Sequence, residues 1–112
     1  KRVSEEKPPI IFGDGEQTRD FVFVSDVVRA NVLAAESDAT GVFNIGQGQR
    51  VTINELTRLI IHIMNKDVGI IYQGARVGDI RHSLADISKA GVFGYEPQCD
   101  LERGLKETIG NL

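Results

Sequence analysis

The stretch GDGEQTRDFVFVSDV, residues Gly13 to Val27, places the pair Arg19-Asp20 between a glycine-rich turn and an apolar run. Gly13-Asp14-Gly15 is a turn signal, because glycine adopts positive φ without steric cost. Phe21 to Val24 are continuously apolar, which is typical of a strand buried on both faces. The charged pair at this boundary either stays in water where the turn ends or holds Arg19 ready to bind an anion.

Around this stretch, predicted strands and helices alternate. A short strand at Ile10–Phe12 precedes it, and a helix with Ser25 as N-cap follows and runs to about Glu36. Thr52-Ile53-Asn54-Glu55 fits a capping box and opens the clearest helix of the chain. The other predicted elements are strands at Val42–Ile45 and Val68–Tyr72, a polar loop at Gln73–Ser83, a short helix at Asp86–Val92 and a last helix at Leu101–Ile109 capped by Asp100. The alternation indicates the α/β class.

The composition is that of an ordinary globular chain. Of the 112 residues, 41% are hydrophobic and 26% are charged, which suits one domain or a piece of one. We expect residues 1–8 to be a polar lead-in segment and residues 9–112 to be the folded domain. The net charge of −3 argues against a nucleic-acid partner, because phosphate binding without sequence readout needs a basic face.

Membrane, disulfide and metal sites are not predicted. The longest apolar runs fall far short of the roughly 20 residues that cross a bilayer, and the first residues do not resemble a signal peptide, which favours a cytoplasmic location. Cys99 is the only cysteine, so an internal disulfide is excluded and thiolate metal binding is unsupported. His62 lies in an apolar helix without ligand residues at metal-binding spacing.

One glycine-rich stretch, Gly46-Gln47-Gly48-Gln49-Arg50-Val51, lies where a dinucleotide fingerprint belongs, after a predicted strand and before a helix. Val51 takes the place of the third glycine, and the capping box starts the helix a full turn too late. The stretch therefore predicts a flexible connection and no cofactor site in this chain. Ser83 has no base and acid around it that indicate an acyl-transfer triad, and no catalytic residue is predicted.

Two arginines remain as candidate ligands of an anion, Arg19 and Arg76. Each lies at the edge of a predicted strand, in a loop, near glycine and aspartate. A guanidinium binds phosphate oxygens through two parallel hydrogen bonds, and two such groups clamp a diphosphate. Either arginine alone fits a solvated surface position better, whereas the pair predicts an anion site.

Motifs along the chain resemble one enzyme family. Pro9-Ile10-Ile11-Phe12-Gly13-Asp14-Gly15, followed by Gln17-Thr18-Arg19-Asp20-Phe21, resembles the carboxy-terminal half of the extended short-chain dehydrogenase/reductase family, and more narrowly NAD-dependent nucleotide-sugar epimerases of the UDP-glucose 4-epimerase kind. Further matches are Val24-x-Asp26-Val27 with Ala30, Val42-Phe43-Asn44-Ile45-Gly46, Arg76-x-Gly78-Asp79, Asp86-Ile87-Ser88-Lys89-Ala90 and Gly94-Tyr95-x-Pro97. The resemblance covers about residues 8 to 110, and it implies the substrate-binding portion of a Rossmann-type α/β enzyme.

The resemblance also implies roles for single residues. Arg19 and Arg76 match arginines that contact the diphosphate of a UDP-sugar from two sides. Asp79 matches an aspartate that bonds the nucleotide ribose, while Ile10 and Phe12 match strand residues that line the base. The implied ligand is UDP-glucose, UDP-galactose or one of their N-acetyl forms.

The position that matches Ser83 faces the sugar, where a bulky residue excludes N-acetyl groups and a serine leaves room. The chain departs from the family because it has neither the glycine fingerprint that holds NAD nor the Tyr-x-x-x-Lys pair. It is therefore expected to be the substrate-binding part of an NAD-dependent enzyme and to catalyse nothing alone. Two alternatives stay open: a fragment of a nucleotide-sugar 4,6-dehydratase or decarboxylase, and a stand-alone binding or interaction module.

The segment 21–46 is expected to pack against the NAD-binding half of the enzyme, which this chain does not supply. Apolar patches larger than a few hundred Å² are uncommon on soluble monomers and tend to be covered by association. The isolated chain is therefore expected to self-associate, with Val28, Val32 and Phe43 at the contact.

Overall fold

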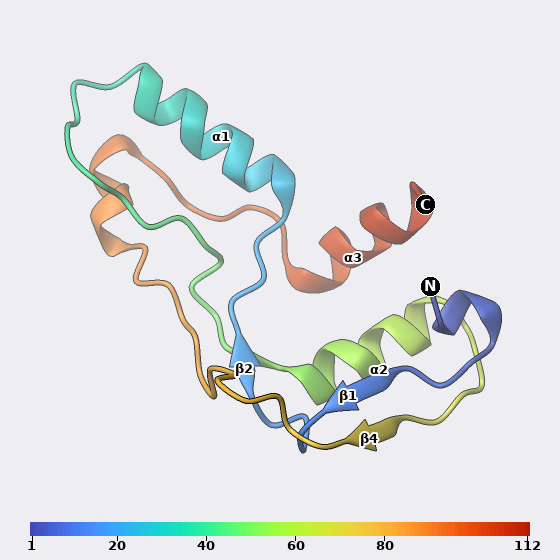
Figure 1. Cartoon of the computed structure of the whole chain (residues 1–112). Coiled ribbons are helices and arrows are strands. Elements are labelled where there is room, and N and C mark those ends of the chain that lie inside the picture. The colour runs from blue at the N-terminus through green and yellow to red at the C-terminus, as the bar shows by residue number, and fades with distance from the viewer.

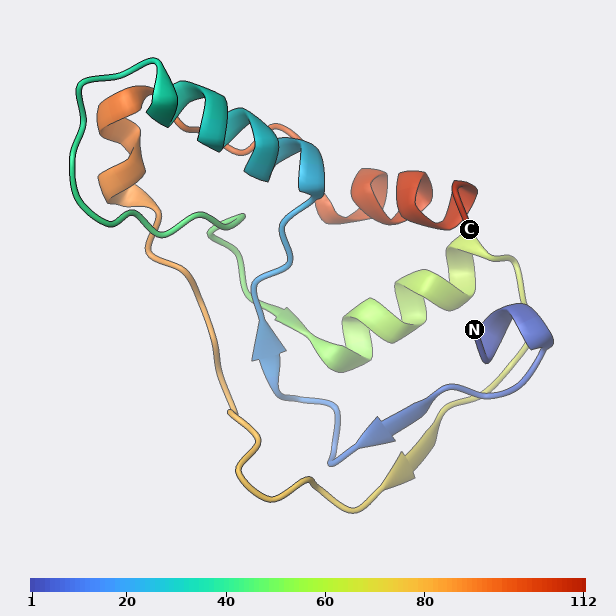
Figure 2. The same ribbon diagram turned by 45° about the horizontal axis from the view of Figure 1, so that its top comes forward.

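The computed structural model describes residues 1–112 as an elongated α/β body that measures 49 × 32 × 16 Å. Its elements are η1 (Val3–Glu5), β1 (Ile10–Phe12), β2 (Thr18–Arg19), α1 (Val24–Ala35), β3 (Val51–Thr52), α2 (Ile53–Ile63), β4 (Ile71–Gln73), η2 (Ser88–Phe93) and α3 (Leu101–Gly110). Figures 1 and 2 show α1 and the orange η2 at one end, and α2, β1, β4 and both termini at the other. The radius of gyration is 16.3 Å, above the ~13 Å of a compact domain of this length.

The first strand pair is parallel. Ile10, Ile11 and Phe12 of β1 pair with Ile71, Tyr72 and Gln73 of β4, and Ile11 is buried. The strand predicted at 10–12 is confirmed, while the one predicted at 68–72 begins three residues later. Because β1 and β4 run in the same direction, the turn after β1 and the loop after β4 leave the sheet at the same edge (Figure 2).

A buried amide, Asn54, joins the turn after β1 to α2 and β4. Its Nδ2 donates to Asp14 O at 3.0 Å, and its Oδ1 accepts from the Tyr72 hydroxyl at 2.7 Å. Gly15 lies so close that a Cβ there would stand 2.0 Å from Asn54 Oδ1, and its φ is +78°. Only glycine fits this position, because both the space and the backbone exclude a side chain.

The second strand, β2, is flanked on both sides. Thr18 and Arg19 pair antiparallel with Thr52 and Val51 of β3. On the other side, Thr18 N donates to Arg81 O at 2.9 Å, and Ser83 N donates to Thr18 O at 3.1 Å. Arg19 therefore lies on a strand and not in a loop as predicted, because this short ladder draws its partners from residues 32 to 34 and 63 to 65 positions away, which local patterns do not reveal.

Two helix starts follow the sequence prediction. The Thr52 hydroxyl accepts from Glu55 N at 3.0 Å, and the Glu55 carboxylate accepts from Thr52 N at 3.2 Å, which completes the capping box. At α3, the Asp100 carboxylate accepts from Arg103 N at 2.8 Å. Helices α2 and α3 pack against each other at the end of the molecule that carries the termini.

Two predicted strands are absent, which corrects the sequence interpretation. Phe21–Val24 and Val42–Ile45 join no ladder. Val24 instead opens α1 and is 64% exposed, while Val42 is 82% exposed. An extended apolar segment becomes a strand only when a neighbour pairs with its backbone, and no other segment of this chain does so.

The start of α1 also differs from the prediction. Its N-cap is Phe23, without a side-chain cap, and not Ser25. The Asp26 carboxylate turns inward, where it accepts from Gln98 N and Cys99 N, both at 3.0 Å. Asp26 lies in the first turn of α1 and also ties this helix to the segment before α3.

The core at the α1 end is small and combines apolar and aromatic groups. Ala30, Ala90 and Tyr95 are buried together, and the Tyr95 hydroxyl donates to Gly46 O at 2.7 Å. Phe43 packs edge-on against Phe93, with ring centroids 4.9 Å apart. The short helix predicted from Asp86 is a 3-10 helix that begins at Ser88.

The N-terminal residues have structure of their own. Val3 lies in the 3-10 turn η1 and is buried, so order begins earlier than the polar pattern of residues 1–8 indicated. None of the helices in the molecule combines the length and apolar character that crossing a membrane requires.

Candidate functional site

A pocket of about 340 Å³ lies between β1, β2 and the loop after β4, within the size range of small-molecule sites. Its lining residues are Ile10, Ile11, Phe12, Gln17, Arg19, Ile53, Arg76 and Asp79. The structure thus brings Arg19, Arg76, Asp79, Ile10 and Phe12 to one concavity, although the two arginines are 57 positions apart in the chain.

Arg19 is held by two contacts. Its Nη1 donates to Thr18 O at 2.7 Å, and its Nη2 lies 2.8 Å from Asp79 Oδ1. The side chain of Arg19 is 26% exposed and that of Asp79 is 36% exposed. The guanidinium is thus fixed at the pocket wall, and part of it faces the open space.

Arg76 is positioned by an aromatic ring. Its guanidinium carbon lies 4.1 Å from the centroid of the Phe12 ring, close enough for a cation–π interaction. Arg76 is exposed and forms no ion pair. One positive charge of the pocket is therefore without a compensating carboxylate.

Ser83 does not line this pocket. It is exposed, and its backbone bonds Thr18, the residue before Arg19. The neighbouring His82 places Nδ1 2.9 Å from Thr18 Oγ1. The segment 81–83 therefore supports the strand that carries Arg19, and Ser83 lies beside the site and not in its wall.

Gln17 is the polar lining residue that sequence reasoning missed. It is 8% exposed, and its Nε2 donates to Phe12 O at 3.0 Å, which braces the end of β1. Ile11 and Ile53 complete the apolar wall. No composition or spacing rule singles out one glutamine in a turn, and only its place in the family motif beside Arg19 marked Gln17.

The glycine-rich stretch after Ile45 has its amides occupied. Gln47 N and Gly48 N donate to the two carboxylate oxygens of Asp20, at 2.8 and 2.9 Å, and Ala85 N donates to the same group at 3.3 Å. A Cβ at Gly46 would stand 2.7 Å from Asp20 Oδ2. These amides cannot cradle a phosphate while they bind Asp20, so the stretch is a junction of three segments.

A second Arg–Asp pair lies outside the pocket. Arg81 donates to both oxygens of Asp14, at 2.7 and 3.0 Å, and ties the turn after β1 to the segment before Ser83. The hydrogen bonds from Arg81 lower the pKa of Asp14 to about 2. Both side chains are more than half exposed, so this pair is a surface contact.

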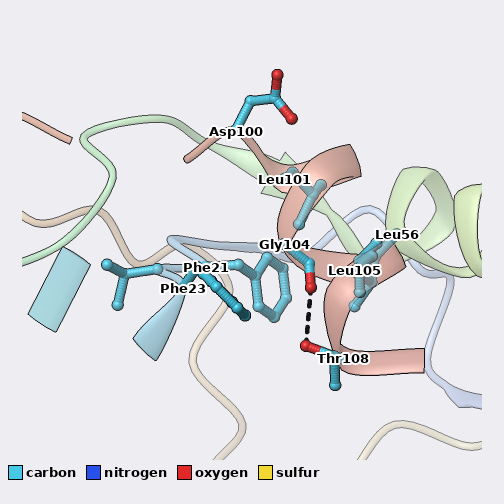
Figure 3. A pocket seen from close by; sticks show the side chains of 9 residues that line it. Phe21, Phe23, Leu56, Asp100, Leu101, Gly104, Leu105 and Thr108 are labelled. Atoms are coloured by element: carbon cyan, nitrogen blue, oxygen red, sulfur yellow. Dashed lines mark hydrogen bonds between the residues drawn. The ribbon is translucent and has the colours of Figure 1, made fainter. Parts of the chain in front are cut away.

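A smaller hollow between the 21–23 segment and α3 is apolar (Figure 3). Phe21, Phe23, Leu101 and Leu105 line it, and the Thr108 hydroxyl is already bonded to Gly104 O at 2.8 Å. Its one titratable residue, Asp100, caps α3. The hollow offers packing space and no reactive group, so the pocket with two arginines remains the candidate site.

Comparison with known proteins agrees with the motifs. Residues 1–46 match the model of the NAD dependent epimerase/dehydratase family. The chain is 39% identical to a UDP-glucose 4-epimerase of Mycolicibacterium smegmatis over 88% of its residues, and 32% identical to UDP-glucuronic acid decarboxylase 1 of Arabidopsis thaliana over 93%. It superposes on the crystal structure of a UDP-glucose 4-epimerase from Thermotoga maritima with UDP-glucose, with a TM-score of 0.92 and 45% identity over 97% of this chain.

Over 88 to 97% of its residues the chain is thus similar to parts of two UDP-glucose 4-epimerases and a related decarboxylase, and its first 46 residues match the NAD dependent epimerase/dehydratase family. The predicted α/β class and the Rossmann-type family are confirmed. The chain spans 32% of the epimerase from M. smegmatis, 24% of the decarboxylase and 36% of the T. maritima structure, so it corresponds to a part of each.

Proposed function

We propose that this chain is the substrate-binding part of an NAD-dependent UDP-sugar 4-epimerase and that the Arg19–Arg76 pocket holds the nucleotide diphosphate. The observation that carries the proposal is the meeting of two guanidinium groups and one carboxylate beside the apolar strand β1. Two cationic forks suit two phosphates, and the apolar wall of Ile10 and Phe12 suits a base. In this arrangement Asp79 is available to a ribose hydroxyl when it is not bound to Arg19.

Titration of the intact protein with UDP tests this proposal. Arg19→Ala should weaken UDP binding by about 1.5 to 3 kcal/mol, the range for hydrogen bonds to charged groups, which is roughly tenfold to 150-fold. Arg58→Ala is the matched control, because Arg58 is an exposed arginine on α2 without a hydrogen-bond partner and outside this pocket. Equal affinity of Arg19→Ala and Arg58→Ala would reject the diphosphate role.

We also propose a reaction, 4-epimerisation, and a sugar, glucose, galactose or one of their N-acetyl forms. The relatives include a UDP-glucuronic acid decarboxylase. The second candidate is therefore a nucleotide-sugar dehydratase or decarboxylase, whose reaction also begins with hydride removal from the sugar. Bound NAD in the intact enzyme would accept and return the hydride. Ser83→Tyr should suppress turnover of UDP-N-acetylglucosamine and spare UDP-glucose, whereas equal loss for both sugars would make Ser83 structural.

The partner of this part is, in our proposal, the NAD-binding half of the same enzyme, which packs on the exposed face of α1. Val28 and Val32 are 55% and 49% exposed there, while Phe43 is half-buried against Phe93. Without that half, the isolated chain is expected to self-associate through the same face. Sedimentation at micromolar concentration should show oligomers that a Val28→Ser/Val32→Ser variant loses, and a monomeric isolated chain would contradict this expectation.

A further inference from the structure

Arg19, at the wall of the pocket, already makes two hydrogen bonds within the chain. Both terminal nitrogens of Arg19 already donate to oxygens of the chain, one to Thr18 O at 2.7 Å and one to Asp79 Oδ1 at 2.8 Å. A diphosphate that uses the outer nitrogen of this guanidinium must therefore share it with a carboxylate or displace that carboxylate. Two anions on one guanidinium repel each other, so sharing is the costly arrangement.

The same ion pair is also what attaches the loop. Residues 74–80 are all exposed, and their backbone bonds within this loop consist of one turn, Asp79 N to Arg76 O at 3.2 Å. The hydrogen bond that joins them to the rest of the chain runs through the Asp79 side chain. The other tie is the stacking of Arg76 on Phe12. Asp79 therefore fixes both the loop and the guanidinium of Arg19.

We propose that Asp79 is an internal stand-in for the ligand's diphosphate. It occupies Arg19 when the pocket is empty, keeps that side chain and loop 74–80 in position, and exchanges with the diphosphate on binding. This inference rests on the proposed function of the same pocket, and it makes Asp79 a positioning residue that weakens the binding of small anions. A role confined to holding the loop would have the opposite effect, since its loss would loosen the site.

The direction in which one substitution changes the affinity for pyrophosphate distinguishes these two roles. Asp79→Asn keeps the shape of the side chain and removes the competing charge, so the intact protein should bind inorganic pyrophosphate about fivefold more tightly. That change corresponds to an exposed ion pair of up to about 1 kcal/mol. The gain should shrink as salt rises, because salt screens partly exposed charges.

Asp14→Asn is the matched control. It removes one negative charge from the exposed Arg81–Asp14 pair, which lies outside the pocket, so the net charge of the protein changes equally. Calorimetric titration with pyrophosphate should show tighter binding for Asp79→Asn than for Asp14→Asn, and a second variant, Asp79→Ala, should repeat the gain. Circular dichroism confirms that each variant is folded.

Binding of pyrophosphate to Asp79→Asn and Asp79→Ala that is no tighter than to Asp14→Asn would overturn the inference. UDP titration of the unchanged protein tells the two proposals apart. If UDP binds and Arg19→Ala weakens it while the Asp79 variants show no gain, the diphosphate site stands and the stand-in role falls. If neither UDP nor pyrophosphate binds the unchanged protein, both are rejected.

Discussion

The two ends of the molecule use aspartate in opposite ways. At the α1 end, Asp26 is 1% exposed, and its carboxylate accepts hydrogen bonds from two backbone amides and a longer one from Arg29 of the same helix. At the pocket end, Asp79 and Asp14 are partly exposed and bond arginine side chains. Backbone amides cannot move away from a buried carboxylate, whereas long side chains at a surface exchange partners readily. The difference indicates that one end carries stability and the other carries recognition.

The largest effect is expected at the buried carboxylate. Asp26→Ala leaves the amides of Gln98 and Cys99 without acceptors, and a buried unpaired group costs about 1 to 3 kcal/mol. The free energy of unfolding, measured by urea titration, should therefore fall by about 2 to 6 kcal/mol for the two amides. Asp38→Ala is the control, because Asp38 is an exposed loop carboxylate without a hydrogen bond, and an equal loss in both variants would refute the contrast.

Acid should remove part of the stability of the α1 end. Burial alone would raise the pKa of Asp26, but the hydrogen bonds from Gln98, Cys99 and Arg29 together lower it below 3.8. A carboxyl whose pKa is lower in the folded state stabilises the fold above its unfolded pKa, and this stability is lost as pH falls through the folded pKa. The urea midpoint should drop below about pH 4, and it should drop less in Asp26→Ala; an identical acid profile would contradict this cause.

Two tyrosine hydroxyls, one at each end of the molecule, should differ in how much they stabilise the fold. Tyr95→Phe removes the buried hydrogen bond to Gly46 O and should cost about 1 kcal/mol of unfolding free energy. Tyr72→Phe removes a bond of the same length, 2.7 Å, to Asn54 Oδ1, but Tyr72 is 47% exposed and Tyr95 5%, so the hydroxyl of Tyr72 gains less from leaving water for this bond. Urea titration should rank Tyr95→Phe as the more damaging change, and the reverse order would break the division between the two ends.

The smallest effect is expected from the exposed pair at the turn. Asp14→Asn breaks the contact with Arg81, whose hydrogen bonds hold the pKa of Asp14 at about 2. Exposed ion pairs contribute little to stability, since water screens them. The urea midpoint at neutral pH should therefore stay close to that of the unchanged protein, and a clear drop would show that the pocket end also depends on its charges for folding.

Two local helix caps were predicted correctly, whereas a third, at Ser25, was wrong. The capping box at Thr52 and the cap at Asp100 were predicted because each is complete within four residues. The strands expected at Phe21–Val24 and Val42–Ile45 failed, because a ladder depends on a partner that local apolarity does not supply. β2 was missed for the same reason, since its two residues obtain partners from β3 and from the segment 81–83.

The residues of the candidate site could be predicted from the sequence, but the contacts between them could not. Two arginines with neighbouring aspartates suggested an anion clamp, and the family motifs assigned Asp79 a place beside them. The sequence gives no sign that Asp79 bonds Arg19, because the two residues lie 60 positions apart and meet only when the loop after β4 folds over β2. The family resemblance placed Ser83 facing the sugar, whereas its position outside the pocket wall depends on its backbone bond to Thr18.

The junction at Asp20 has a consequence for the order of folding. Its carboxylate accepts hydrogen bonds from Gln47, Gly48 and Ala85, which lie 27, 28 and 65 positions after Asp20 in the chain. Helices α2 and α3 contain their own caps and form from near neighbours, whereas this junction requires the closure of long loops, which is slow. We expect it to form after the transition state, so its loss would speed unfolding and leave the folding rate nearly unchanged. The hydrogen bonds of Asp20 would thus slow unfolding and lengthen the time for which the arginine pocket stays assembled.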